Sequence, residues 1–210
     1  MEDLLHLYDQ RKNEIKNSLE EFSKVKEMDG RRMFSELVFC LCTPQSKATM
    51  CWDAVKKLNE NGTLVEGSNK KIEKILKGVR FHKTKAKRIV RAREKFFADG
   101  NFKIKKVLEG TEDDKTLREW LVKNVEGFGM KEASHFMRNV GRGENVAILD
   151  RHILRNLHKH GILDNIPETM TERKYVEIET KMKDFADNLG IPLAELDILF
   201  WSKETGFIFK

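Results

Sequence analysis

A short glycine turn separates two amphipathic segments in the second half of this 210-residue chain. Apolar residues recur at the spacing of one helix face on both sides of that turn: Leu117, Trp120, Leu121 and Val125 before it, and Ala133, Phe136, Met137 and Val140 after it. The turn reads Val125-Glu126-Gly127-Phe128-Gly129, and glycine tolerates the positive φ that a tight reversal needs. The pattern predicts a helix-hairpin-helix at about residues 114–140.

Helical periodicity extends over nearly the whole chain. Helices are expected at about residues 4–22, 33–41, 44–59, 69–77, 83–98, 113–124, 130–140, 150–160, 171–188 and 193–203. The three prolines, Pro44, Pro167 and Pro192, each fall where a helix can start, and Thr43 is expected to cap the helix that opens at Pro44. Because no sustained two-residue alternation occurs, we predict an all-α fold.

The length and composition indicate a soluble globular protein. A chain of 210 residues can bury a sizeable core, so we expect one unit over residues 1–210, with two lobes around a cleft. Its apolar runs are too short to cross a bilayer and its acidic N-terminus does not resemble a secretory signal, so we expect it to stay in the cytoplasm, where it is made. Cys40, Cys42 and Cys51 lie close together, in a pattern that favours buried apolar residues over a disulfide framework or a metal site. The net charge of +6 modestly favours a polyanionic partner.

The glycine turn also has a candidate chemical role. Its bare backbone would let amide groups approach a phosphate, and the N-terminus of the helix that follows favours an anion. Gly127 and Gly129 could therefore bind a phosphate of a DNA strand without reading any base. The same residues would equally serve an ordinary turn between two helices.

Lys131 lies in the first turn of the second hairpin helix, and Asp150 follows it after nineteen residues. With Ser134, His135 and Arg138, Lys131 forms a polar row, which is typical of a solvated helix face. The helix dipole disfavours a cation here and so favours the neutral amine, which is the form that a nucleophile requires. Asp150 precedes an amphipathic run and fits a helix N-cap, a role that is compatible with facing a cleft.

The hairpin, Lys131 and Asp150 together resemble the helix-hairpin-helix (HhH-GPD) DNA glycosylases, whose signature is a Gly-x-Gly hairpin, a catalytic lysine and a downstream catalytic aspartate. More narrowly, three stretches are similar to the archaeal-type 8-oxoguanine DNA glycosylase/AP lyase family: Lys131–Phe136, Arg138–Gly141 and Ala147–Arg155. The resemblance covers about residues 34–210 and is strongest over 120–157. Residues 42–47 depart from the pattern, since they are more similar to other helix-hairpin-helix glycosylases.

The resemblance implies a two-lobed helical enzyme that excises 8-oxoguanine from DNA. Lys131 would attack the sugar C1′ and displace the base, and Asp150 would stabilise the positive charge that develops on the sugar. The resulting Schiff base would permit β-elimination, which cuts the strand. His152 would contact a phosphate near the lesion, although an exposed helix residue would look the same in sequence.

The family's base-binding residues correspond to Phe81 and Trp201, together with the terminal carboxylate carried by Lys210. A flipped base offers flat π faces and hydrogen-bonding edges, which such groups can grip. Without the resemblance, Phe81 and Trp201 fit core aromatics, and the end of the chain fits a docked tail.

The segment 82–95 holds seven basic residues and one acidic residue, around an inner stripe of Ala86, Ile89 and Val90. Its charge fits either phosphate binding or a solvated helix face. The resemblance implies that the partner is double-stranded DNA with a damaged base, bound by a monomer that does not contact a membrane.

No cofactor and no metal are required by this chemistry, although the resemblance allows a monovalent cation on the hairpin carbonyls. No cysteine follows Cys51, which excludes the four-cysteine iron–sulfur cluster of some relatives. Two other functions remain open: a glycosylase/lyase for a different damaged base, and a non-catalytic helix-hairpin-helix DNA-binding module. The second would need neither Lys131 nor Asp150. The basic helix disfavours a helical protein-interaction domain.

Overall fold

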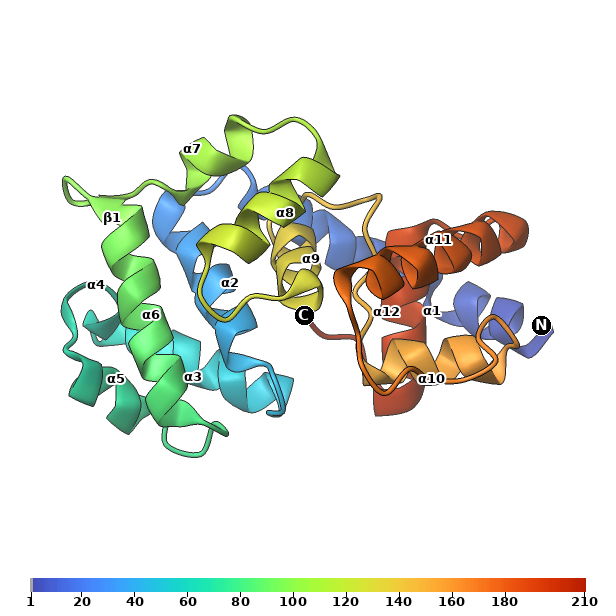
Figure 1. The fold of residues 1–210 in the computed structure, drawn as a ribbon, viewed down its shortest axis with the longest axis horizontal. Helices are drawn as coiled ribbons and strands as arrows, with labels where there is room; N and C mark the ends of the chain where they lie inside the picture. The colour runs from blue at the N-terminus through green and yellow to red at the C-terminus, as the bar shows by residue number, and fades with distance from the viewer. Residues whose placement is uncertain (1) are drawn as a thin grey trace. The chain divides into compact units, whose positions relative to one another are not determined.

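The computed structural model describes residues 2–210, and these residues form twelve helices and one small antiparallel sheet (Figure 1). The helices are α1 (Glu2–Val25), α2 (Gly30–Cys42), α3 (Ala48–Glu60), α4 (Thr63–Glu66), α5 (Asn69–Ile75), α6 (His82–Phe96), α7 (Ile104–Glu109), α8 (Asp114–Asn124), α9 (Met130–Asn139), α10 (Arg151–Lys159), α11 (Glu172–Leu189) and α12 (Leu193–Thr205). The strands β1 (Phe97–Ala98) and β2 (Asn101–Phe102) pair with each other. The all-α prediction is confirmed, since the sheet is only a two-residue hairpin.

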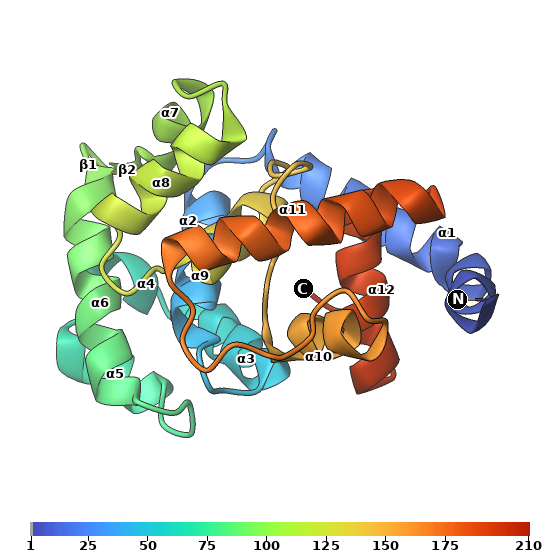
Figure 2. The ribbon, with the colours of Figure 1, turned by 45° about the vertical axis from the view of Figure 1, so that its right-hand side comes forward.

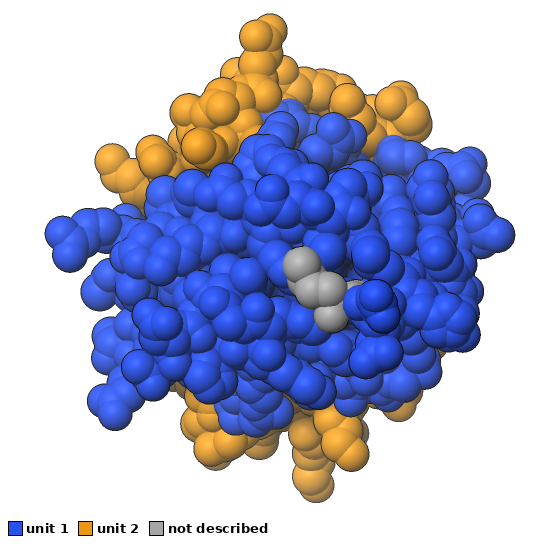
Figure 3. Space-filling view, turned by 90° about the vertical axis from the view of Figure 1, so that its right-hand side faces the viewer, with its two compact units in different colours: residues 1–24, 137–210 blue, residues 25–136 orange. Residues whose placement is uncertain are grey.

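The chain divides into two compact units, as a two-lobed fold requires. Unit 1 consists of Met1–Lys24 and Met137–Lys210, and unit 2 of Val25–Phe136 (Figure 3). None of the helices within residues 2–210 is both long and apolar enough to cross a membrane.

Unit 2 is built around α2, in which every residue from Met33 to Cys42 is buried. The helix begins where Asp29 caps it by accepting a hydrogen bond from the Arg32 amide at 2.8 Å. It packs against α3, α6, α7 and β2, and the Phe34 ring stacks on Phe102 with 4.3 Å between ring centroids. A helix that is buried all round needs such neighbours on every side, which explains its central place in the unit.

In unit 1, α12 contacts both α10 and α11, and α11 crosses α12 in both views of the ribbon (Figures 1 and 2). The ring of Phe200 on α12 stacks on His160, which follows α10, and lies near Phe185 on α11. The N-terminal helix is attached to this group because the Tyr8 hydroxyl donates to Glu195 Oε2 at 2.6 Å. Unit 1 therefore has its own core, which surrounds α12.

Two of the three predicted helix starts at proline are wrong. Thr43 ends α2 instead of capping the next helix, and its hydroxyl donates to the Cys40 carbonyl, while α3 begins only at Ala48. Pro44 lies in the turn between these helices. Pro167 also lies in a loop, because α11 starts later, after the Thr171 N-cap. Pro192 does directly precede α12, as predicted.

A further deviation from the predicted helix pattern occurs after α6. The helix predicted to end at about residue 98 ends at Phe96, because the chain turns back through β1 and β2 with a left-handed residue at Asp99 (φ 53°). The short helices α4 and α7 were not predicted. All three cysteines are free and buried, as predicted, and the Cys51 thiol donates to the Cys42 carbonyl.

A buried ion pair joins α9 and α12 within unit 1. Arg138 Nη1 lies 2.7 Å from Asp197 Oδ2, and both side chains are buried. Burial raises the pKa of Asp197 to about 7, against the attraction of Arg138 and with the help of the Asp150 charge. Between its ordinary pKa of 3.8 and 7, the folded protein therefore holds a proton that the unfolded chain has released.

This protonation predicts how stability depends on pH. The contribution of Asp197 to the free energy of unfolding is complete below about pH 4 and is lost as the pH rises through 7. Urea unfolding of the wild type and of Asp197→Asn should therefore show a stability difference that changes across this range. The matched control is Asp187→Asn, which removes an exposed carboxylate paired with Lys183. A difference between wild type and Asp197→Asn that stays constant from pH 4 to 8 would contradict the prediction.

Candidate active site

The glycine turn joins α8 to α9 with the geometry that the sequence predicted. Gly127 has φ 96°, and the Phe128 amide donates to the Val125 carbonyl at 3.0 Å. Phe128 is buried and its ring lies 6.2 Å from that of Phe136, which anchors the turn to α9. These two helices and their turn occupy residues 114–139, where the helix-hairpin-helix was predicted.

Basic side chains of α6 contact this hairpin. A Cβ built on Gly127 would lie 2.6 Å from Arg88 Cδ and 2.7 Å from Arg88 Nε, so the Arg88 side chain lies directly against the bare glycine backbone. Arg91 forms an ion pair with Glu126, and Lys95 Nζ donates to Asn124 Oδ1 at 2.7 Å. The positive charge of α6 is therefore concentrated beside the hairpin.

Not every basic residue of α6 contacts the hairpin or the solvent. Lys85 is buried, with 1% of its surface exposed. Of the predicted inner stripe, Ala86 and Ile89 are buried and Val90 is partly buried. Burial lowers the pKa of Lys85. The prediction that the basic residues of this segment are all solvated or bind phosphate is wrong for Lys85.

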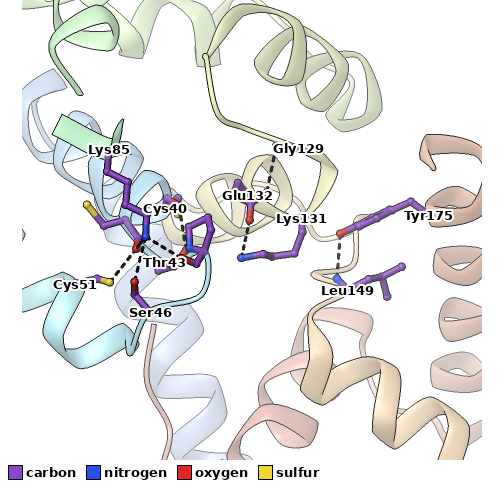
Figure 4. Close-up of polar contacts among 12 residues, drawn as sticks. Cys40, Thr43, Ser46, Cys51, Lys85, Gly129, Lys131, Glu132, Leu149 and Tyr175 are labelled. Carbon is purple, nitrogen blue, oxygen red and sulfur yellow. Dashed lines mark hydrogen bonds and ion pairs between the residues drawn. The ribbon is translucent and has the colours of Figure 1, made fainter. Parts of the chain in front are cut away.

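Lys131 lies in the first turn of α9, and 24% of its side chain is exposed. Its Nζ is 2.9 Å from Glu132 Oε1, while Glu132 Oε2 accepts a hydrogen bond from the Gly129 amide at 3.2 Å (Figure 4). One carboxylate therefore holds both the amine and the end of the hairpin. Glu132 was not singled out from the sequence, although a glutamate three residues after a helix N-cap often reaches back in this way.

The polar row that follows Lys131 on α9 is buried, which corrects the prediction of a solvated face. The Ser134 hydroxyl accepts from Arg118 Nη1 at 3.3 Å, and the His135 ring meets Phe39 edge to face. Arg138 belongs to the buried ion pair with Asp197. Ser134 and Arg138 thus each have a buried polar partner, which offsets the loss of hydration on burial.

Asp150 caps α10, as predicted. Its Oδ1 accepts hydrogen bonds from the amides of His152 at 2.7 Å and Ile153 at 2.9 Å. The cap fixes the carboxylate at the N-terminus of α10, where the helix dipole favours negative charge. His152, in the first turn of the same helix, is partly buried.

The segment that leads to Asp150 is held by α11. The Tyr175 hydroxyl accepts a hydrogen bond from the Leu149 amide at 3.0 Å (Figure 4). It donates to the Ala147 carbonyl at 2.7 Å. Glu179, one turn further along α11, accepts from the Ala147 amide at 2.7 Å. Two buried polar side chains thus satisfy the backbone just before the aspartate. The signal in the sequence was a tyrosine and a glutamate four residues apart, which lie on one helix face.

The predicted base-binding residues have different surroundings. Phe81 is 53% exposed, has φ 58°, and carries the Arg80 guanidinium over its ring at 4.9 Å, so it is not a core aromatic. Trp201 is partly exposed and meets Phe207 edge to face at 5.4 Å. Lys210 Nζ lies 5.7 Å from the centroid of the Phe22 ring, which docks the end of the chain within unit 1.

Each unit carries part of the predicted site. Gly127, Gly129, Lys131 and Phe81 belong to unit 2, and Asp150, His152, Trp201 and Lys210 to unit 1. Unit 2 therefore supplies an amine beside a glycine hairpin and an exposed aromatic ring. Unit 1 supplies a capped carboxylate. No cluster of three or more histidine, cysteine or acidic side chains within residues 2–210 is arranged to hold a metal ion.

Comparison with known proteins accounts for this combination. The family model described as 8-oxoguanine DNA glycosylase matches residues 15–191. The chain belongs to that family. A curated 8-oxoguanine DNA glycosylase/AP lyase from Fusobacterium nucleatum is 43% identical over 205 residues, covering 97% of this chain and 94% of its relative. One from Methanocaldococcus jannaschii is 38% identical over 202 residues, covering 95% and 93% of the two chains.

The fold agrees with that of solved 8-oxoguanine DNA glycosylases. A crystal structure of the Methanocaldococcus jannaschii 8-oxoguanine glycosylase/lyase, in complex with a 15mer DNA containing 8-oxoguanine, is 35% identical to this chain. The similarity covers all of both chains with a TM-score of 0.89. The helical HhH-GPD fold predicted from the resemblance is therefore confirmed.

The contact between Gly127 and Arg88 predicts the effect of adding one methyl group. Gly127→Ala should lower the free energy of unfolding, because alanine at positive φ costs about 1–2 kcal/mol and its Cβ would also displace Arg88. Gly62→Ala is the matched control, since Gly62 has φ 65° but nothing within 4 Å of an added Cβ. In an Arg88→Ala background the extra cost at Gly127 should disappear in urea unfolding. An equal cost in both backgrounds would show that Arg88 does not set the requirement for glycine.

The hydroxyl of Tyr175 predicts a local effect on the segment before Asp150. Tyr175→Phe should leave the buried Leu149 amide without this partner, at a cost of about 1–3 kcal/mol, and hydrogen exchange over residues 147–150 should become faster. Tyr8→Phe, which removes the other buried tyrosine hydroxyl bonded to Glu195, should leave exchange in this segment unchanged. If exchange over 147–150 is the same in Tyr175→Phe and wild type, α11 does not hold the segment.

Proposed function

We propose that this protein is a bifunctional DNA repair enzyme, which removes 8-oxoguanine from duplex DNA and then cleaves the strand by β-elimination. The observation that carries the proposal is the partly exposed amine of Lys131, held in the first turn of the helix that follows a glycine hairpin. Membership of the 8-oxoguanine DNA glycosylase family adds the substrate class. A DNA-binding module without catalysis would not need the amine of Lys131, and would need Asp150 only as the cap of α10.

In the proposed reaction the lone pair of the Lys131 amine forms a bond to the sugar C1′. The bond between C1′ and the base breaks, and the base leaves with that electron pair and takes up a proton. The amine loses its proton and the sugar ring opens, which gives a Schiff base between Lys131 and C1′. Loss of a proton from C2′ then expels the 3′ phosphate and cuts the strand.

Asp150 acts on the charge that this reaction develops. Its carboxylate stabilises the positive character of the sugar while the bond to the base breaks, and it assists the proton transfers that follow. The N-cap contacts to the His152 and Ile153 amides occupy one carboxylate oxygen, Oδ1. We assign Asp150 this role on the family resemblance, and the cap explains why its side chain has a defined orientation.

The remaining assignments concern binding. Gly127 and Gly129 offer backbone amides to a DNA phosphate, and His152 contacts a phosphate near the lesion. Phe81 and Trp201 stack on the flipped base, and the terminal carboxylate of Lys210 reads its edge. The exposed ring of Phe81 supports its part of this assignment.

The same chemistry defines what the enzyme would need. An amine and a carboxylate suffice for it, so we propose that no cofactor or metal is required, although hairpin carbonyls could bind a monovalent cation. We propose that residues 1–210 act as one functional unit and as a monomer on double-stranded DNA. We also propose a cytoplasmic location without membrane contact, at the prokaryotic nucleoid.

Borohydride trapping tests the function directly. The protein is incubated with duplex DNA that carries one 8-oxoguanine, and borohydride reduces any Schiff base to a stable covalent adduct. We expect an adduct with the wild type and none with Lys131→Gln. The matched control is Lys123→Gln, which removes an exposed lysine of α8 and should still give the adduct.

Other outcomes would change the proposal in distinct ways. An adduct on a different lesion, with none on 8-oxoguanine, would keep the lysine chemistry and replace the substrate. If no lesion and no abasic site gives an adduct, the lyase activity is refuted.

A further inference from the structure

The amine of Lys85 is bonded to the turn between α2 and α3. Lys85 Nζ donates to the carbonyls of Cys42 at 2.6 Å and Pro44 at 2.8 Å, and to Ser46 Oγ at 3.1 Å (Figure 4). All three acceptors lie in a stretch of five residues that forms no helix beyond Cys42. A side chain of α6 therefore supplies the hydrogen bonds that this turn cannot make within itself.

The same cluster reaches the backbone of Arg80. Ser46 Oγ accepts a hydrogen bond from the Arg80 amide at 3.0 Å as well as from the Lys85 amine. The Lys85 amide in turn donates to the Phe81 carbonyl at 3.0 Å. The residue before Phe81 and the carbonyl of Phe81 itself are thus both tied to Lys85.

Phe81 needs such support. It has φ 58°, a left-handed conformation that is unfavourable for a residue other than glycine and persists only where the surroundings hold it. The residue is 53% exposed, so burial does not hold it in place. The hydrogen bonds on either side of Phe81 are therefore what holds its backbone, and with it the position from which the ring extends.

The burial of a charged amine here also has a physical cost. An apolar side chain of similar length would fill the same space without losing hydration, whereas a buried ammonium is tolerated only when its donors are satisfied. An apolar residue, however, would leave the Cys42 and Pro44 carbonyls and the Ser46 hydroxyl, which accepts from the Arg80 amide, without this donor. The hydrogen bonds of the amine therefore indicate that Lys85 holds this part of the backbone in a defined conformation.

We propose that Lys85 is a positioning residue for base recognition, which acts through Ser46 to hold the exposed ring of Phe81 where a flipped base can stack on it. The proposal rests on the proposed function, within which Phe81 is assigned to the base. It predicts that Lys85 matters only for steps in which the base is present. An abasic site has no base, so its cleavage by Lys131 should not depend on this cluster.

The experiment compares two single-turnover rates on matched duplexes, base removal from 8-oxoguanine and strand cleavage at an abasic site. Lys85→Met keeps the length of the side chain and removes its hydrogen bonds. We expect base removal to fall about 10- to 100-fold, as displacement of a group that contacts the substrate does, while abasic-site cleavage stays within about twofold of wild type. Lys87→Met, an exposed lysine of the same helix, is the matched control and should change neither rate.

A second variant keeps the test decisive if Lys85→Met does not fold. Ser46→Ala removes the link to Arg80 but leaves Lys85 its two carbonyl acceptors, so base removal should fall by a factor comparable to that in Lys85→Met while abasic-site cleavage is unchanged. Unchanged base removal in folded Ser46→Ala would overturn the proposal, as would an equal fall of both rates in Lys85→Met. A wild type that acts on neither duplex would instead refute the proposed function.

Discussion

The burial of α9 is the constraint on which the candidate site depends. From Ala133 to Asn139 every residue of this helix is buried, although several are polar. A buried polar group destabilises the fold unless a partner replaces the water that it loses, so each of these side chains must meet a particular neighbour. Those contacts fix the rotation of the helix about its axis. They therefore also fix the direction in which Lys131 points from its first turn.

The hairpin before α9 places an amine beside a stretch of bare backbone. A lysine at a helix N-terminus meets an unfavourable dipole, and here Glu132 supplies the compensating charge while also receiving the Gly129 amide. Arg88 lies against Gly127 in the same hairpin. The glycine is thus required twice, once for its φ of 96° and once because Arg88 occupies the space of a side chain.

Much of this arrangement could be predicted from the sequence, because apolar periodicity reports helices directly. The longer helices, the hairpin and the Asp150 cap all follow from local patterns of residue type. The helix start at Pro44 was wrong because a threonine followed by proline fits an N-cap as well as a turn. Only the tertiary contacts of Ser46 and Lys85 decide between these.

The polar row on α9 and the burial of Lys85 were missed for a related reason. Local sequence shows that a residue is charged or polar, but it does not show whether another segment provides a partner. The partners of Ser134 and Lys85 lie sixteen or more residues away along the chain. From residue type alone, such residues are therefore predicted to be exposed to solvent. That prediction is correct for most charged residues, but it is wrong where a polar side chain has a structural role in the interior.

Two parts of the candidate site are held in the same way, although they belong to different units. Tyr175 and Glu179 bind the backbone just before Asp150, and Lys85 binds the turn that leads through Ser46 to Phe81. In both cases the functional side chain lies on a short irregular segment, where backbone amides and carbonyls have no helical partners.

A helix beside each segment satisfies those groups with buried polar side chains. Because the neighbouring helix holds the backbone of the segment, the functional side chain does not need to pack in the core and can contact substrate. It also explains why the positioning residues lie on regular helices, since a rigid element limits how far the segment it holds can move. The polar residues that seemed out of place inside the helices are the ones that give the irregular segments a defined geometry.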